Sequence, residues 1–352
     1  MAGQYKYNYG PLLPSRDSIR LLKLDPRKQE SDPLTGTLEV IRLSLVKVPE
    51  YTALSWVWGR EAPTVTIPCS NNKNNKGGGI KVTRNLFNAL QNLESLGHRS
   101  LWVDSICINQ DDIKERASQV ALLAQIYESA KTVIVWLGED HPATDIDAHD
   151  GTTLTGPPIW ESKTSPKVPS PDSDSLLLSY LQRPWFSRGW TLQEMMLAPS
   201  VSVLLEHQEL KWDAFWDRTL VELSQSVCSS IGFDGQIEIP AFAELPLQLY
   251  TLVSTAKVIP FLRKQSVPKR NLVDISLHEA AAIELANILN YYRATWATDP
   301  RDQVYALMGL VEPLGIEIPT PDYSQTVEAV FREAGLALFK TGKVTHSKSR
   351  IT

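Results

Sequence analysis

The first part of the chain alternates between apolar and polar residues. Residues 18–24 and 37–45 both show a period of two, which is typical of strands with one buried face. Between them, residues 32–36 read Asp-Pro-Leu-Thr-Gly and supply turn-forming chemistry. The pattern predicts an N-terminal β-hairpin extension over residues 1–48.

Further along, short and almost continuously apolar segments predict buried strands. They cover residues 51–58, 101–106, 132–137 and 201–205. A second hairpin is predicted from residues 65–69 and 80–82, which flank an Asn-, Lys- and Gly-rich tip.

Two helices are predicted between these strands. Thr83 is a candidate N-cap for a helix that carries Leu86, Leu90 and Leu93 on one face. Asp112 and Glu115 have capping-box spacing. The helix after them is expected to bury one stripe, made of Ile113, Ala117, Val120, Leu123 and Tyr127. Strands that alternate with helices predict a parallel sheet with right-handed crossovers.

The second half of the chain changes in character. Residues 139–175 are rich in Pro, Ser, Thr and Asp and show little periodicity, which predicts a mobile insertion. Helices are expected at 210–227, 247–258, 278–292 and 326–339. The predicted organisation is an N-terminal extension (1–48), a doubly wound α/β core (49–227) and a helical C-terminal region (228–352).

Composition and charge exclude several classes of protein. Hydrophobic residues make up 43% of the chain, and the net charge of -5 gives no basic surface for nucleic acid. No apolar run approaches the roughly 18 to 20 residues that span a bilayer. The cysteines (Cys69, Cys107 and Cys228) are too few and too scattered for a disulfide framework or a zinc site. We therefore expect a cytoplasmic protein that binds neither nucleic acid nor membrane.

Long motif blocks carry the strongest information. Residues 51–59 read Tyr-Thr-Ala-Leu-Ser-Trp-Val-Trp-Gly, and residues 101–112 read Leu-Trp-Val-Asp-Ser-Ile-Cys-Ile-Asn-Gln-Asp-Asp. Residues 183–194 read Arg-Pro-Trp-Phe-Ser-Arg-Gly-Trp-Thr-Leu-Gln-Glu, and residues 297–310 contain Asp-Pro-Arg-Asp. In this order the blocks resemble the signature of the fungal heterokaryon-incompatibility (HET) domain, over about residues 49–198. Trp56 stands where the family usually has Tyr.

The resemblance implies a function in incompatibility signalling, a form of fungal innate immunity that ends in programmed cell death. Nucleotide-binding modules often accompany the domain in that family, but this sequence has no Gly-x-x-x-x-Gly-Lys-Ser/Thr loop. Protein partners of the incompatibility pathway, or further copies of the same chain, are therefore expected to participate. One hypothesis is that the protein is a non-catalytic adaptor that acts through such contacts.

The HET domain is also similar to TIR domains, which have a flavodoxin-like parallel sheet and in some members cleave NAD. TIR hydrolases often carry Trp-x-x-x-Glu on the helix of the catalytic Glu, and Trp190 and Glu194 have this spacing. The resemblance implies that Glu194 stabilises an oxocarbenium-like transition state as nicotinamide leaves. The competing interpretation is a buried or surface carboxylate with no catalytic part. Under the enzymatic hypothesis NAD is the candidate substrate. No cofactor or metal is expected.

Candidate substrate-binding residues lie near the ends of the predicted strands, where open α/β sheets bind ligands. Each also has a structural interpretation: a tight turn for Gly59, backbone bonding in the 107–111 turn for Asp104, an ion pair for Arg188 and a core position for Trp190. Ser187 is a candidate cap for the helix after it. The full set of candidates is Ser55, Trp58, Gly59, Asp104, Asn109, Arg188 and Trp190.

Overall fold

The computed structural model describes residues 7–13, 17–45, 48–71, 78–138, 180, 183–205, 207–219, 295, 297–312 and 316–348. The predicted mobile insertion at 139–175 and the predicted helices at 247–258 and 278–292 lie outside these residues. Within the described part, no helix is long and apolar enough to cross a membrane.

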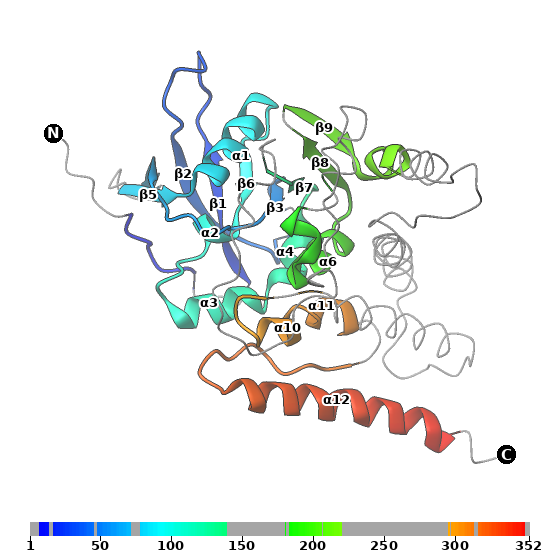
Figure 1. Cartoon of the computed structure of the whole chain (residues 1–352). Coiled ribbons are helices and arrows are strands. Elements are labelled where there is room, and N and C mark those ends of the chain that lie inside the picture. Colours follow the sequence, from blue (N-terminus) through cyan, green and yellow to red (C-terminus); the bar gives the residue numbers. More distant parts are fainter. Residues whose placement is uncertain are drawn as a thin grey trace, which may run out of the picture.

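A nine-stranded mixed sheet forms the centre of the described structure (Figure 1). Its order is β5-β4-β2-β1-β6-β3-β7-β8-β9. The strands are β1 (Ser18–Leu24), β2 (Gly36–Arg42), β3 (Thr52–Ser55), β4 (Val65–Asn71), β5 (Gly78–Val82), β6 (Ser100–Trp102), β7 (Thr132–Trp136), β8 (Val201–Leu205) and β9 (Gln208–Lys211).

The sheet is mixed: its middle strands are parallel, and β2 also pairs in parallel with β4. β3 pairs in parallel with β6 and β7, and β7 pairs in parallel with β8. The outer pairs β1–β2, β4–β5 and β8–β9 are antiparallel, as is β1–β6. The α/β class is confirmed, but the expectation of a parallel sheet holds only for β6, β3, β7 and β8 and for the separate pair β2–β4. TIR-like details of the fold stay a prediction.

The predicted N-terminal hairpin is present as β1 and β2, with Ser18 opposite Arg42 and Leu24 opposite Gly36. A Cβ atom on Gly36 would lie 2.6 Å from the Lys23 carbonyl oxygen, so the close pairing of these strands requires glycine there. The predicted pairing of residues 65–69 with 80–82 is confirmed as β4–β5. Because β1 also pairs with β6, the hairpin continues the same sheet.

The described helices are α1 (Arg84–Ser95), α2 (Asp104–Cys107), α3 (Ile113–Val120), α4 (Leu123–Ser129), η2 (Pro184–Ser187), α6 (Gly189–Met196), α10 (Asp302–Tyr305), α11 (Met308–Val311) and α12 (Val327–Lys348). The Thr83 side chain caps α1 by accepting from the Leu86 amide at 3.2 Å. The Asp112 side chain caps α3 by accepting from Lys114 and Glu115 amides. Both caps were predicted, and both satisfy amides that have no partner inside the helix.

Several predicted elements differ from the structure. The strand expected at 101–106 ends at Trp102, and α2 begins at Asp104. The expected helix after Asp112 breaks into α3 and α4, and Ile113 at its start is 60% exposed. The helix expected from residue 210 begins at 212, because β9 occupies the preceding residues. Ser187 does not cap α6; its hydroxyl donates to the Pro184 carbonyl at 2.8 Å.

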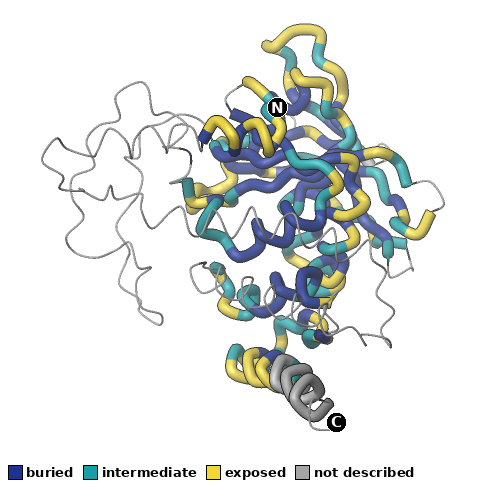
Figure 2. The backbone as a smooth tube through the Cα atoms, turned by 90° about the vertical axis from the view of Figure 1, so that its right-hand side faces the viewer, coloured by how far each residue is buried: buried dark blue, intermediate teal, exposed yellow. Residues whose placement is uncertain are grey.

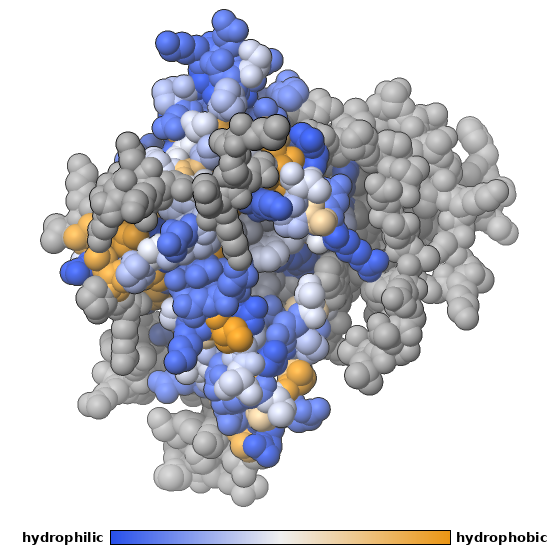
Figure 3. All heavy atoms as spheres, turned by 90° about the vertical axis from the view of Figure 1, so that its left-hand side faces the viewer, coloured by the Kyte–Doolittle hydropathy of each residue, from blue (hydrophilic) through white to orange (hydrophobic). Residues whose placement is uncertain are grey.

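Buried residues run through the sheet and the adjoining helices, whereas the tip of the β1–β2 hairpin is exposed (Figure 2). Trp102, Trp136 and Trp185 are among the largest fully buried side chains. On the face shown in Figure 3, the described residues are mainly hydrophilic, with hydrophobic residues in separate small groups. Much of the tryptophan content therefore serves the core, where aromatic side chains bury the most area.

Candidate functional site

Polar side chains from the motif blocks meet at the carboxyl edge of the parallel strands. Ser55 is the last residue of β3, and Asp104 follows β6 as the first residue of α2. Helix α6, which begins after Arg188, contacts both β3 and α4 and brings Glu194 to the same place. Ligands of open α/β sheets bind at this edge, as the sequence predicted for these residues.

Glu194 lies at the centre of the group and is only 6% exposed. One of its carboxyl oxygens, Oε2, accepts a hydrogen bond from the Ser55 hydroxyl, and the Tyr127 hydroxyl bonds to the same carboxyl group. The Trp185 indole in turn donates to Ser55 Oγ at 2.8 Å. Burial raises the pKa of Glu194 from 4.5 to about 7, against the opposing effect of the nearby Arg188 charge.

Asp104 holds two indole rings in place. Its Oδ1 accepts from Trp56 Nε1 at 2.9 Å and from the Ser105 amide at 2.7 Å, and its Oδ2 accepts from Trp58 Nε1 at 2.7 Å. The two indoles stack with centroids 6.2 Å apart. Burial raises the pKa of Asp104, partly offset by these hydrogen bonds. The Asp104 side chain thus accepts hydrogen bonds from the two indoles, whereas the sequence predicted bonds from the backbone of the 107–111 turn.

Arg188 acts on both carboxyl groups through its positive charge. Its Nη1 donates to the Trp56 carbonyl oxygen, and its positive charge lowers the pKa of both Glu194 and Asp104. One guanidinium therefore compensates two buried acids, a role for which its planar, permanently charged group is suited. The loop after β3 is held to the start of α6 by the same contact.

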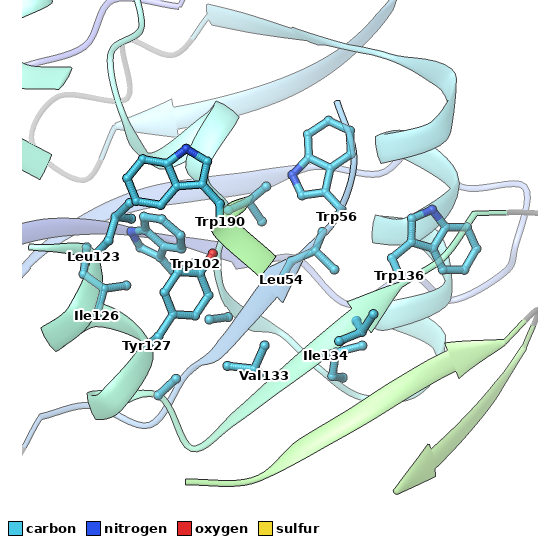
Figure 4. Close-up of a cluster of buried hydrophobic side chains, with 14 of the residues drawn as sticks. Leu54, Trp56, Trp102, Leu123, Ile126, Tyr127, Val133, Ile134, Trp136 and Trp190 are labelled. Carbon is cyan, nitrogen blue, oxygen red and sulfur yellow. The ribbon is translucent and has the colours of Figure 1, made fainter. Parts of the chain in front are cut away.

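The remaining predicted residues have other partners or a role in the backbone. The Asn109 amide donates to Glu115 Oε1 at 2.7 Å. Gly59 has a φ of 69°, and an added Cβ would meet no atom within 4 Å, so the backbone turn alone favours glycine. Trp190 is 9% exposed, lies in the buried cluster with Trp102 and Tyr127 (Figure 4), and bonds to the Asp302 side chain.

Tyr127, Trp185 and Trp56 also belong to the site, although the sequence did not predict them as site residues. Tyr127 and Trp185 are fully buried, yet each directs its polar atom into the group, to Glu194 and to Ser55 respectively. The available signal was chemical: a buried Tyr or Trp needs a partner for its hydroxyl or indole N–H. Trp56 also belongs here, since its indole bonds to Asp104 and its carbonyl to Arg188.

The arrangement combines a buried acid, Glu194, with one exposed indole, that of Trp58. Trp58 is 40% exposed, whereas Glu194 and Ser55 are buried. A carboxyl group with a pKa of about 7 exchanges a proton readily at neutral pH, which suits general acid–base work. Among the residues that the structure describes, no group of three or more His, Cys, Asp or Glu side chains is arranged to hold a metal ion.

Comparisons with known proteins agree with the motif blocks. The family described as "Heterokaryon incompatibility protein (HET)" matches residues 51–194, a range that runs from β3 to Glu194. "Heterokaryon incompatibility protein 6, OR allele" of Neurospora crassa is 26% identical over 379 residues, covering 96% of this chain and 54% of the relative. "Vegetative incompatibility protein HET-E-1" of Podospora anserina is 26% identical over 159 residues, covering 44% of this chain and 10% of the relative.

The chain thus spans about half the length of the Neurospora relative and a tenth of the Podospora one. No solved structure matches it. The family match contains every motif block that forms the group around Glu194, and the similarity to the Neurospora protein extends over nearly the whole chain. Residues 51–194 of the chain therefore match the heterokaryon incompatibility (HET) family.

Proposed function

We propose that this protein is a cytoplasmic effector of heterokaryon incompatibility, which triggers programmed cell death on non-self recognition. The support comes from two relatives that are named as incompatibility proteins and that are similar to 96% and 44% of this chain. The trigger reaches the effector through protein partners of the pathway or through association with further copies of the chain.

The finer part of the proposal is chemical: the protein cleaves NAD at the bond between nicotinamide and ribose. The observation that carries it is the environment of Glu194, a buried carboxyl group with a pKa of about 7, bonded to two hydroxyl groups at the carboxyl edge of the sheet. In the reaction, ribose hydroxyls replace the hydroxyl partners of Glu194. The carboxylate then stabilises the positive charge that develops on the ribose as nicotinamide leaves. Water from the solvent adds to the same ribose carbon and releases a proton, so the products are nicotinamide and ADP-ribose.

The neighbours of Glu194 fit this chemistry. Trp58 offers an exposed indole face whose orientation is fixed by Asp104, and planar rings stack on such faces. Arg188 supplies a positive charge beside both acids, which suits an anionic diphosphate. We assign Trp58 and Arg188 to substrate binding and Glu194 to catalysis.

A non-catalytic adaptor is the second candidate, and one observation favours it. Glu194 is 6% exposed and already hydrogen-bonded within the protein, as expected for a polar group that specifies a fold. In this case the motif blocks build the domain, and death signalling proceeds through surface contacts.

The deciding experiment measures nicotinamide release from NAD by the purified chain, artificially clustered, beside two variants. Glu194→Gln removes the acid while keeping its shape. Glu94→Gln is the matched control, because Glu94 is equally buried at 5% exposure but lies on α1, where it pairs with Arg27 and Arg99. Release by the parent and Glu94→Gln, but not by Glu194→Gln, supports the enzyme. Intact NAD in all folded samples, with toxicity retained in cells, refutes the enzyme and favours the adaptor.

A further inference from the structure

A segment far downstream of the matched HET region packs against the helix that carries Glu194. Helices α10 and α11 both contact α6, and α11 also contacts α4. Figure 1 shows α10 and α11 between α6 on one side and α12 on the other. The Gly309 amide of α11 donates to Gln193 Oε1 at 3.3 Å, although the two residues are 116 positions apart in the chain. Gln193 directly precedes Glu194.

The fit between α11 and its neighbours leaves no room for a side chain at Gly309. A Cβ atom there would lie 2.7 Å from Ala124 Cβ, 2.9 Å from Leu197 Cδ1 and 3.2 Å from Gln193 Cδ. These neighbours belong to α4 and to α6 with its C-cap. Helix backbones approach one another this closely only where a small residue faces the contact. Glycine at this position therefore sets how closely α11 packs against α4 and α6.

A second contact holds the first turn of α6. The Trp190 indole hydrogen-bonds to the side chain of Asp302, the first residue of α10. Asp302 Oδ1 also accepts from the Tyr323 hydroxyl at 2.7 Å. Burial raises the pKa of Asp302, and the hydrogen bonds from Tyr323 and Trp190 oppose that effect. Contacts from the same downstream segment thus reach both turns of α6.

The segment is itself anchored by the Asp-Pro-Arg-Asp block. Arg301 pairs with both oxygens of Asp299 at 2.7 and 2.9 Å, and it donates to the carbonyl oxygens of Tyr323 and Gln325 at 2.7 and 2.8 Å. The guanidinium groups of Arg301 and of Arg116 on α3 lie 5.3 and 4.4 Å from the centre of the Tyr323 ring. Tyr323 therefore joins the downstream segment to α3 as well as to Asp302.

Helix α6 needs such support because it is weak on its own. It has eight residues, about two turns, and its N-cap residue Arg188 makes no side-chain capping bond. Isolated helices of this length are unstable in water, so packing alone decides where the helix lies. All eight residues are buried. The contacts that bury them come from β3 and α4 on the one hand and from α10 and α11 on the other.

We propose that residues 297–312 and 316–325 complete the functional unit as a positioning segment, in which Asp302 and Gly309 hold α6 so that Glu194 stays against Ser55 and Tyr127. The matched family region ends at residue 194, so this part of the unit lies outside it. Asp302, Gly309 and Tyr323 are positioning residues, because they act through Trp190 and Gln193 and do not touch Glu194. Only the activity arm of the test below rests on the proposed function.

The first test compares two glycine-to-alanine variants of the full chain by hydrogen exchange of residues 189–196. Gly309→Ala adds a methyl group into the α11 contact, whereas Gly335→Ala adds the same group on α12, where a Cβ meets nothing within 4 Å. Both changes favour helix formation equally. We expect about tenfold faster exchange of α6 in Gly309→Ala, as for overpacking at a close contact. Equal α6 exchange in the two folded variants would overturn the proposal.

A gentler series keeps the proposal testable if Gly309→Ala does not fold. Asp302→Ala removes the acceptor of the Trp190 indole, while Asp302→Asn keeps a carbonyl oxygen at that place. We expect Asp302→Ala to speed α6 exchange and shift the Trp190 indole N–H resonance, and Asp302→Asn to restore both toward the parent. No difference between Ala and Asn at this position contradicts the positioning role.

The activity arm separates this inference from the proposed function. Nicotinamide release is measured on the same folded variants, and loss in Asp302→Ala with recovery in Asp302→Asn supports both ideas. If no sample releases nicotinamide but the exchange pattern holds, the enzymatic proposal fails and the positioning segment stands. If the parent releases nicotinamide and the exchange pattern is absent, the positioning segment fails alone.

Discussion

The raised pKa of Glu194 makes a quantitative prediction about stability. The unfolded chain releases this proton near pH 4.5, whereas the folded protein keeps it up to about pH 7. Between these values unfolding releases a proton, so the free energy of unfolding falls as the pH rises. The difference corresponds to about 3 kcal/mol lost between pH 4.5 and 7, with a slope of up to about 1.4 kcal/mol per pH unit.

Glu194→Gln isolates this contribution because the amide does not titrate. Urea unfolding of both proteins from pH 5 to 8 gives two stability curves, and their difference is the measured quantity. From pH 5 to pH 8 we expect the free energy of unfolding of the variant, relative to that of the parent, to rise by about 2 to 3 kcal/mol. Asp104, whose pKa is also raised by burial, is present in both proteins, so most of its effect cancels. Curves that stay parallel within about 0.5 kcal/mol would refute a neutral, buried Glu194.

Two further predictions concern the charges around the site and the N-terminal strand. Arg188→Ala is expected to raise the pKa of Glu194 further and to lower the free energy of unfolding by about 1–3 kcal/mol. The loss should be larger at pH 8 than at pH 5, because Glu194 is ionised at pH 8. An equal loss at both pH values in urea unfolding would contradict this. Arg20 bonds to both carboxyl oxygens of Glu115, at 2.5 and 3.0 Å, so Arg20→Met leaves the mostly buried Glu115 without its positive partner and is expected to cost about 3 kcal/mol. Adding Glu115→Gln should recover much of that loss in thermal unfolding, and no recovery would show that packing rather than charge is responsible.

Sequence patterns located most of the described strands but not the register or breaks between them. Period-two alternation predicted β1 and β2, and apolar runs predicted β3, β7 and β8, because side-chain burial repeats locally along a strand. β9 was missed, since its residues Gln208–Lys211 are largely polar and lie at an edge of the sheet. The prediction made β6 too long, because the chain turns into α2 at Asp104, whose side chain bonds to Trp56 and Trp58.

The Asp112–Glu115 pair shows that a local sequence pattern can predict a helix cap but not a partner that is distant in the chain. Asp112 caps α3 as its position predicts, but Glu115 does not return a bond to it as a capping box would. Instead Glu115 pairs with Arg20 and accepts from the Asn109 amide. Arg20 lies 95 residues away in the chain, so nothing in the local pattern reveals it.

By itself, the sequence determined the match of residues 51–194 to the HET family, the α/β class and the candidate acid Glu194, because these depend on motif blocks and on periodicity within short segments. Only the tertiary structure decided that the outer strands make the sheet mixed, that Ser55 reaches Glu194 across 139 residues, and that Gly309 seats against Gln193. The physical reason is that local patterns report the burial of each residue but not its partner. Partners, and with them the pKa of Glu194, are set by long-range packing of elements that are distant in the chain.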